Sequence, residues 1–241
     1  FIFLLNFDKD KNYSMEKNME NIKENRDVIL TKIKDIHKNS FFKNSVPPRL
    51  IAVSKKQEEY KIDDAIKIGH RFFGENRVQE AIQRWENRIK DYNDIELRLI
   101  GPLQTNKVKQ ALKIFNIIET IDREKLAKSI SDNIDDNIKT KSFYIQVNTG
   151  DEVQKAGVPA LEANNFIEFC KNDLSLPIIG LMCIPPENEE PAMHFSLLRK
   201  LALKNNLVEL SMGMSNDFEE AIKFGATSVR IGSKFFGDRK Y

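Results

Sequence analysis

Short apolar runs recur along most of the chain, and each is followed by a longer segment whose apolar residues have helical spacing. The runs are rich in branched side chains and are bounded by charged or turn-forming residues, which is typical of strands buried on both faces. This pattern predicts eight strands, at residues 50–54, 72–74, 97–100, 117–121, 143–147, 178–181, 208–210 and 228–231.

The segments between the runs predict helices. Residues 62–69 and 218–225 both place apolar residues at i, i+3 and i+4 and a glycine at i+7. Regular alternation of strands and helices favours parallel pairing. Eight units in 241 residues fit a closed (β/α)8 (TIM) barrel, which typically needs about 250 residues. We therefore expect an α/β protein whose further helices lie at residues 78–89, 107–115, 124–134, 161–171 and 193–205.

An additional amphipathic helix is expected at residues 15–38, on the outside of the barrel. Residues 1–14 open with an apolar stretch that is too short to span a bilayer and lacks the basic start of a signal peptide. We expect residues 1–14 to be a leader or a disordered extension, and residues 15–241 to form a single domain. The apolar face of the helix would consist of Ile22, Ile29, Ile33 and Ile36.

Composition narrows the classes of partner. The chain carries 38 basic and 36 acidic residues, a net charge of +2, which argues against a nucleic-acid-binding surface. No later segment reaches transmembrane length, so no membrane association is expected. Cys170 and Cys183 show neither metal-ligand spacing nor a disulfide framework, which fits a reducing cytoplasm.

Ligands bind to barrels of this type at the carboxyl ends of the strands. Lys55 follows the first expected strand, where apolar walls would help its amine lose a proton and condense with an aldehyde. Asn76 follows the second strand and Met182 the sixth. A simple solvated lysine is the alternative for Lys55, because Lys56 follows at once.

Small and hydroxyl-bearing residues follow the last two expected strands. Ser211, Gly213 and Ser215 precede a helix, and Gly232 and Ser233 follow the eighth strand. Backbone amides in such loops bind phosphate, and barrels often bind phosphate after strands seven and eight. The alternative is that these residues form only tight turns and a helix cap.

Arg230 lies inside the eighth expected strand, where a charge needs a partner. That partner could be a carboxylate such as Glu75, or the ring nitrogen of a bound ligand. A phosphate cup, a lysine at a strand end and an arginine facing a ring nitrogen together describe a site for pyridoxal 5'-phosphate (PLP).

Many short motifs occur in a fixed order along the chain. They are residues 52–55 (Ala-Val-Ser-Lys), 73–76 (Phe-Gly-Glu-Asn), 78–80 (Val-Gln-Glu), 100–107 (Ile-Gly-Pro-Leu-Gln-Thr-Asn-Lys), Asn148, Lys155, Gly157, 180–182 (Gly-Leu-Met), 210–215 (Leu-Ser-Met-Gly-Met-Ser), 229–232 (Val-Arg-Ile-Gly) and 236–237 (Phe-Gly). With these motifs the chain resembles the PLP-binding homeostasis proteins, which are small single-barrel relatives of alanine racemase. The resemblance covers about residues 15–241.

The resemblance implies a barrel of the alanine racemase N-terminal-domain type and a role in intracellular PLP homeostasis. Residues of the matching motifs would bind the cofactor. Lys55 would carry PLP as a Schiff base, Arg230 would face the pyridine nitrogen, Asn76 and Met214 would line the ring, Ser211, Ser215, Gly232 and Ser233 would hold the phosphate, and Met182 and Gly213 complete the expected site. An arginine stays protonated, so it would bind the ring nitrogen without protonating it.

The chain departs from the family at one place. The family usually has an aromatic residue and then a histidine before the Ile-Gly of the third strand, and Leu97 and Arg98 occupy those positions here. Any role of that histidine therefore does not transfer to this chain.

Three functions are compatible with these residues. The first is a non-catalytic PLP carrier or buffer that influences amino- and keto-acid balance, with PLP-dependent apoenzymes as candidate partners. The second is a PLP-dependent amino-acid racemase, which needs a second proton carrier opposite the lysine. The third is a barrel that binds a sugar phosphate without an imine. We favour the first and expect a monomer, because no tyrosine follows a strand end facing the site and the chain has no room for the second domain of alanine racemases.

Overall fold

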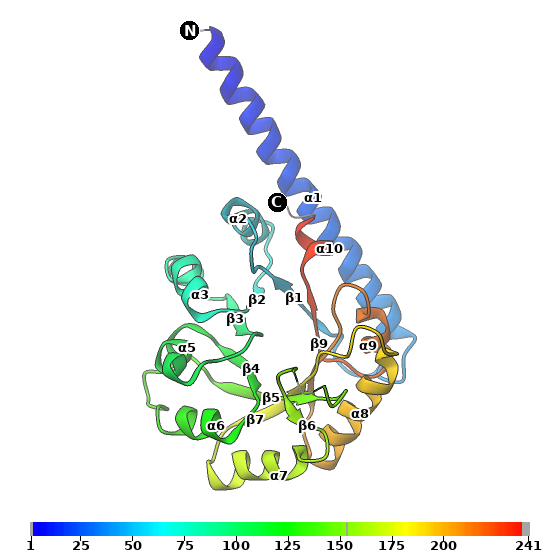
Figure 1. Cartoon of the computed structure of the whole chain (residues 1–241). Coiled ribbons are helices and arrows are strands. Elements are labelled where there is room, and N and C mark those ends of the chain that lie inside the picture. The colour runs from blue at the N-terminus through cyan, green and yellow to red at the C-terminus, as the bar shows by residue number, and fades with distance from the viewer. Residues whose placement is uncertain (1, 153, 238–241) are drawn as a thin grey trace.

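A ring of parallel strands surrounded by helices forms the body of the protein (Figure 1). The structure is a computed structural model that describes residues 2–152 and 154–237, with the backbone alone for residues 2–16. Eight strands close the ring in the order β1, β2, β3, β4, β5, β7, β8, β9 and back to β1, and every neighbouring pair is parallel. The strands are β1 (Arg49–Val53), β2 (Phe72–Glu75), β3 (Glu96–Leu99), β4 (Ile117–Ile121), β5 (Ser142–Asn148), β7 (Ile178–Met182), β8 (Glu209–Ser211) and β9 (Ser228–Ile231).

The expected eight-stranded barrel is confirmed, and one short strand outside the ring was not expected. This strand, β6 (Val158–Pro159), pairs with the end of β5. The helices between the strands are α2 (Glu59–Lys67), α3 (Val78–Trp85), α4 (Arg88–Asp91), η1 (Thr105–Lys107), α5 (Val108–Ile114), α6 (Glu124–Ser131), α7 (Ala163–Glu168), η2 (Phe169–Asp173), α8 (Pro191–Lys204) and α9 (Phe218–Lys223), and α10 (Ser233–Phe236) follows β9.

Two predicted helices are divided in the structure. The helix expected at residues 78–89 is split into α3 and α4, and the helix expected at 161–171 ends in the π-helical turn η2. Apolar spacing predicted where these helices lie, but it does not reveal a local change in backbone hydrogen bonding, because such a change leaves the order of apolar and polar residues in the sequence unaltered.

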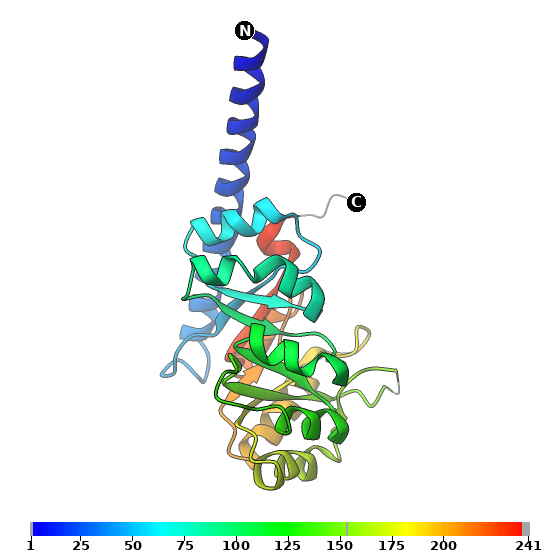
Figure 2. The same ribbon diagram turned by 90° about the vertical axis from the view of Figure 1, so that its left-hand side faces the viewer.

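The N-terminal helix α1 (Ile2–Lys38) packs on the outer side of the barrel against α2, α9 and α10. Its expected apolar face is confirmed, since Ile22, Ile29 and Ile33 are all buried. The helix also continues through residues 2–14, and this part projects beyond the barrel (Figure 2). Within the described part of the chain, no helix combines the length and the apolar character that crossing a bilayer requires.

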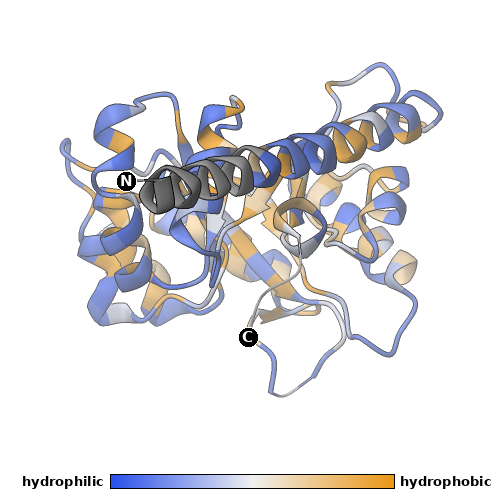
Figure 3. Ribbon diagram, turned by 90° about the horizontal axis from the view of Figure 1, so that it is seen from above, coloured by the Kyte–Doolittle hydropathy of each residue, from blue (hydrophilic) through white to orange (hydrophobic). Residues whose placement is uncertain are grey.

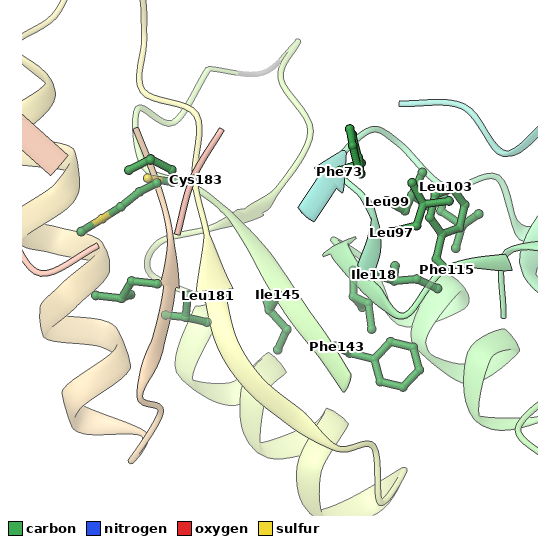
Figure 4. Close-up of a cluster of buried hydrophobic side chains, with 14 of the residues drawn as sticks. Phe73, Leu97, Leu99, Leu103, Phe115, Ile118, Phe143, Ile145, Leu181 and Cys183 are labelled. Atoms are coloured by element: carbon green, nitrogen blue, oxygen red, sulfur yellow. The ribbon is translucent and has the colours of Figure 1, made fainter. Parts of the chain in front are cut away.

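The main hydrophobic core lies between the strands and the surrounding helices. Figure 3 shows hydrophobic residues gathered along the central strands and hydrophilic residues over much of the outer helices. In the close-up of Figure 4, Leu97 and Leu99 of β3 lie beside Phe115, while Leu181 and Cys183 belong to the opposite side of the ring. Successive residues of a strand point to opposite faces, so the residues between these apolar ones face the interior of the barrel.

The interior of the barrel is more polar than the sequence indicated. A small cluster of Ile117, Tyr144 and Met182 is separate from the main core. The side chains of Arg98 and Glu119 are completely buried and form an ion pair there, at 2.9 Å. Burying two charged side chains costs desolvation free energy. The hydrogen bonds that Arg98 and Glu119 make to neighbouring side chains therefore bear on the site at the carboxyl ends of the strands.

His70 gives stability a dependence on pH. Its Nε2–H donates to the carbonyl oxygen of Phe72 (2.8 Å), and its ring packs against Phe73 and Phe235. Burial, and then the positive charges of Arg26 and Arg71, lower its pKa from 6.5 to about 4. In the unfolded chain the imidazole binds a proton below pH 6.5, whereas in the folded chain it stays neutral down to about pH 4. The free energy of unfolding therefore decreases as the pH falls through this window.

Because of the lowered pKa of His70, we expect the free energy of unfolding to decrease by about 3 kcal/mol between pH 7 and pH 4. Urea denaturation at a series of pH values measures this loss. The variant His70→Gln, which keeps a donor for the Phe72 carbonyl, should show a shallower decrease over the same window. An equal decrease in both proteins would mean that other groups cause the effect.

Candidate functional site

A cavity of about 730 Å³ opens at the carboxyl ends of the strands. Its volume lies within the range of about 300–1,000 Å³ that is usual for small-molecule sites. Seven of the ten residues that the sequence assigned to the site line it. They are Lys55, Asn76, Met214, Ser215, Arg230, Gly232 and Ser233.

Lys55 lies two residues after the end of β1, half-buried at the edge of this cavity. The residue before it, Ser54, is held firmly. Its backbone N–H donates to the carbonyl oxygen of Gly74 (3.1 Å), and its hydroxyl donates to Oε1 of Glu75 (2.7 Å). These bonds fix the backbone from which the lysine side chain extends.

Glu75 does not face Arg230, so it is not the partner that the sequence left open. Its carboxylate is completely buried on the outer side of β2, where it accepts hydrogen bonds from Arg84 (3.1 Å) and from the indole N–H of Trp85 (3.1 Å). Arg84 also donates to the carbonyl oxygen of Ser54 (2.8 Å). Glu75 therefore braces the end of β1 against α3 and supports Lys55 indirectly.

Asn76 offers the clearest sign that the cavity is built for a polar ligand. Its side-chain oxygen Oδ1 is buried and, among the described residues, has no hydrogen-bond partner, although it belongs to a residue that lines the cavity. Such an unsatisfied polar atom is rare in folded proteins and is expected where a ligand or water completes the site.

The loops after β8 and β9 close the same side of the cavity. Ser215 precedes α9, and Gly232 immediately precedes α10, whose first residue is Ser233. Gly213 makes the turn out of β8 at φ +92°, and a Cβ there would lie 2.6 Å from the Cβ of Ala221. The turn therefore requires glycine, both for its backbone conformation and for its close packing.

Arg230 points from β9 into the cavity and is almost completely buried. One terminal nitrogen, Nη1, donates to the hydroxyl oxygen of Ser211 (2.7 Å), and the other, Nη2, donates to the carbonyl oxygen of Cys183 (2.8 Å). Its backbone N–H donates to the carbonyl oxygen of Gly213 (2.9 Å). Neutral oxygen atoms thus hold the guanidinium group in place. Because neither partner is an anion, the positive charge of Arg230 stays available to a ligand in the cavity.

Three expected site residues, Met182, Ser211 and Gly213, are buried and do not line the cavity. The sequence placed Ser211 in a loop after a strand ending at residue 210, but β8 extends through Ser211. The side chain consequently faces the barrel interior, where its hydroxyl donates to Glu119 (2.6 Å). Met182 lies in the interior cluster below the cavity.

Sequence reasoning missed several residues around the site. Glu119 lies within the expected strand at residues 117–121 and was not singled out there. The segment 184–191 after β7, which contains three prolines, forms a wall of the cavity, and no motif pointed to it. Lys155, one of the motif residues, also lines the cavity and is paired with Glu152 (2.5 Å).

Comparison with known proteins gives the family. The profile described as "Alanine racemase, N-terminal domain" matches residues 36–240. The pyridoxal phosphate homeostasis protein of Aquifex aeolicus is 41% identical over 205 residues, which cover 80% of this chain and 88% of that protein. The chain belongs to the pyridoxal phosphate homeostasis protein family. The resemblance that the motifs indicated is confirmed, and the Vibrio alginolyticus member of this family is 36% identical over 92% of this chain and 100% of its own length.

Solved structures agree with this assignment. PipY of Synechococcus elongatus PCC7942, determined with PLP bound, is 31% identical and has a TM-score of 0.72, covering 85% of this chain and 100% of PipY. An alanine racemase from Corynebacterium glutamicum has a TM-score of 0.63 and is 18% identical, covering 92% of this chain and 62% of the racemase. The racemase likeness concerns the barrel fold alone.

Proposed function

We propose that this protein binds pyridoxal phosphate and acts in its homeostasis as a carrier or buffer, holding the cofactor as a Schiff base on Lys55. The observation that carries the proposal is the convergence of Lys55, Asn76 and Arg230, from the ends of the three strands β1, β2 and β9, on one cavity. Membership of the homeostasis protein family and the PLP bound in PipY support it. When bound, the cofactor would supply an aldehyde that condenses with an amine and releases water.

The residues of the cavity fit the cofactor group by group. Arg230 is held by two neutral oxygens and can donate to a ring nitrogen without giving up its proton. The unpartnered Oδ1 of Asn76 can accept a hydrogen bond from a polar substituent of the ring. We assign the phosphate to Ser215, Gly232 and Ser233, whose hydroxyls and backbone amides lie at the loops where barrels often bind phosphate.

We propose a non-catalytic role, which the lack of a tyrosine of the alanine racemase kind in the described lining of the cavity supports. Racemisation needs a second proton carrier on the opposite face of the substrate. Among the described residues, the lining of the cavity includes neither tyrosine nor histidine. Tyr144 is completely buried inside the barrel, away from this lining, and burial raises the pKa of its hydroxyl well above the ordinary value. We therefore infer that the protein carries its cofactor rather than turning over amino acids.

The compartment, the oligomeric state and the partner proteins of this protein stay predictions. Cys170 and Cys183 are both buried and form no disulfide, in keeping with a reducing cytoplasm. We retain the proposals that the protein is a monomer and that PLP-dependent apoenzymes receive its cofactor.

An absorbance spectrum of the purified protein with PLP tests the proposal. We expect an imine band that borohydride reduces, and peptide mapping should then place the reduced cofactor on Lys55. The absence of an imine band, or labelling spread over exposed lysines, would leave only a phosphate-binding barrel.

The same sample distinguishes a carrier from a racemase. Alanine and other amino acids should keep their configuration during prolonged incubation with the loaded protein. Clear turnover would contradict the carrier and would identify the protein as a PLP-dependent racemase.

A further inference from the structure

A chain of buried polar contacts crosses the barrel below the cavity. Arg98 on β3 donates from Nη1 to Oε1 of Glu119 on β4 (2.9 Å). The other oxygen of Glu119, Oε2, accepts the hydroxyl proton of Ser211 on β8 (2.6 Å), and Ser211 Oγ accepts from Nη1 of Arg230 on β9 (2.7 Å). Four strands thus contribute to one continuous connection between the middle of the barrel and the floor of the cavity.

We propose that Arg98 and Glu119 are positioning residues for the cofactor, because they orient Ser211 and through it hold the Arg230 guanidinium group in place. The identity of the ligand in this inference rests on the proposed function. The effect of Arg98 and Glu119 on Arg230 does not, because the contacts that produce it are all within the protein.

The chemistry of the donors and acceptors allows only one arrangement. A guanidinium group can only donate, and an ionised carboxylate can only accept. Ser211 has a single hydroxyl proton, so this proton must point to Glu119 and the lone pairs must face Arg230. Ser211 therefore has no proton left for a phosphate group, and its part in the site is to fix Arg230.

Arg98 pairs with Glu119 in the barrel interior. Both side chains are completely buried, where an unpaired charge is costly and a paired one is tolerated. Burial works against the charge of Arg98, but the carboxylates of Glu119 and Glu96 outweigh it, and the pKa of Arg98 is raised. Arg98 is itself anchored by Glu96 (2.7 Å) and by the hydroxyl of Ser228 (3.3 Å).

The pair also explains the departure at position 98. A histidine there would not need a full negative charge beside it, whereas an arginine buried in the barrel does. Glu119, on the adjacent strand, supplies that charge and uses its second oxygen for Ser211. The arginine and the glutamate therefore form one unit, and we expect them to be exchangeable only together.

The test compares Glu119→Gln, Arg98→Met and the double variant with the wild-type protein and with Thr140→Val. Thr140 is also a buried polar residue, but its hydroxyl donates to the carbonyl oxygen of Phe115 (2.8 Å) and it is not one of the four linked residues, so it is the control. The double variant removes both charges at once, which keeps the barrel free of an unpaired buried charge if either single variant fails to fold.

The first readout is NMR of the Arg230 guanidinium group in the protein without cofactor, assigned with Arg230→Lys. We expect one ordered set of signals in the wild-type protein and in Thr140→Val, and motional averaging in Glu119→Gln and in the double variant. Unchanged Arg230 signals in a folded double variant would overturn the positioning role, whatever the ligand is.

The second readout uses PLP labelled with ¹⁵N in the pyridine ring. In the variants the ring-nitrogen shift should move away from its hydrogen-bonded value, and binding should weaken about tenfold, since a hydrogen bond to a charged group is disturbed. The ³¹P signal of the phosphate should stay unchanged.

If the wild-type protein fails to bind PLP, the proposed function fails, and the Arg230 signals still decide whether Arg98 and Glu119 are positioning residues. If the ring-nitrogen shift is the same in all folded variants, the inference is wrong.

Discussion

Replacing Lys55 with alanine is expected to abolish covalent binding of PLP and to weaken the remaining binding about 100-fold. Lys55 extends into the cavity from a backbone that Ser54 fixes through Gly74 and Glu75. Among the described residues, one further lysine lines the cavity: Lys155, which is paired with Glu152 (2.5 Å) and also contacts the carbonyl oxygen of Pro185. We therefore expect no second lysine to take over the imine.

Absorbance titration with PLP measures both parts of this effect. In Lys55→Ala the imine band should be absent, while weak non-covalent binding through the phosphate loops should persist. The matched control is Lys56→Asn, which removes a lysine charge at the next position. Lys56 is exposed and has φ 58°, a conformation that asparagine tolerates. A Lys55→Ala protein that keeps a borohydride-reducible band would show that another amine holds the cofactor.

The variant must also remain folded for the result to count. Lys55 is half-buried and lies in a turn after β1, outside the hydrophobic core, so its truncation should leave the unfolding free energy within about 1 kcal/mol of the wild-type value. Loss of the imine with unchanged stability therefore separates a chemical role of Lys55 from a structural one.

The strands and most strand-end residues could be predicted because both depend on local pattern. Each strand is a short apolar run, and in a parallel barrel every carboxyl end reaches the same side. Lys55, Asn76 and Ser233 needed only this rule to be placed together, and the structure brings them to one cavity. Arg230 was singled out as a charge inside an expected strand, and the resemblance to the family added its expected direction toward the ring nitrogen.

The contacts below the cavity could not be predicted, because they depend on register and on pairs distant in sequence. Extending β8 by one residue turns Ser211 from the loop to the barrel interior, since alternate residues of a strand face opposite sides. Arg98 and Glu119 are 21 residues apart in sequence and meet only because β3 and β4 pair side by side. No apolar pattern identifies such a pair, because each residue alone interrupts its strand in the same way as a surface charge would.

Replacing Gly101 with alanine is expected to weaken PLP binding about tenfold and to reduce the unfolding free energy by about 1–3 kcal/mol. A Cβ at Gly101 would lie 2.3 Å from the carbonyl oxygen of Asn76 and 2.7 Å from its Cα. Gly101 cannot move aside easily, because its own carbonyl oxygen accepts a hydrogen bond from the hydroxyl of Thr120 (2.8 Å). The strain therefore falls on Asn76, a residue that lines the site.

Urea denaturation and PLP titration of Gly101→Ala measure the two effects separately. The control is Gly69→Ala, in the connection between α2 and β2. Gly69 has φ +84°, and a Cβ there would meet no atom within 4 Å, so alanine strains only its own backbone, by about 1–2 kcal/mol. Gly69→Ala should lose similar stability and keep its affinity for PLP. Only Gly101→Ala should displace the backbone of Asn76. Equal affinity for PLP in both variants would therefore mean that Asn76 does not contact the cofactor.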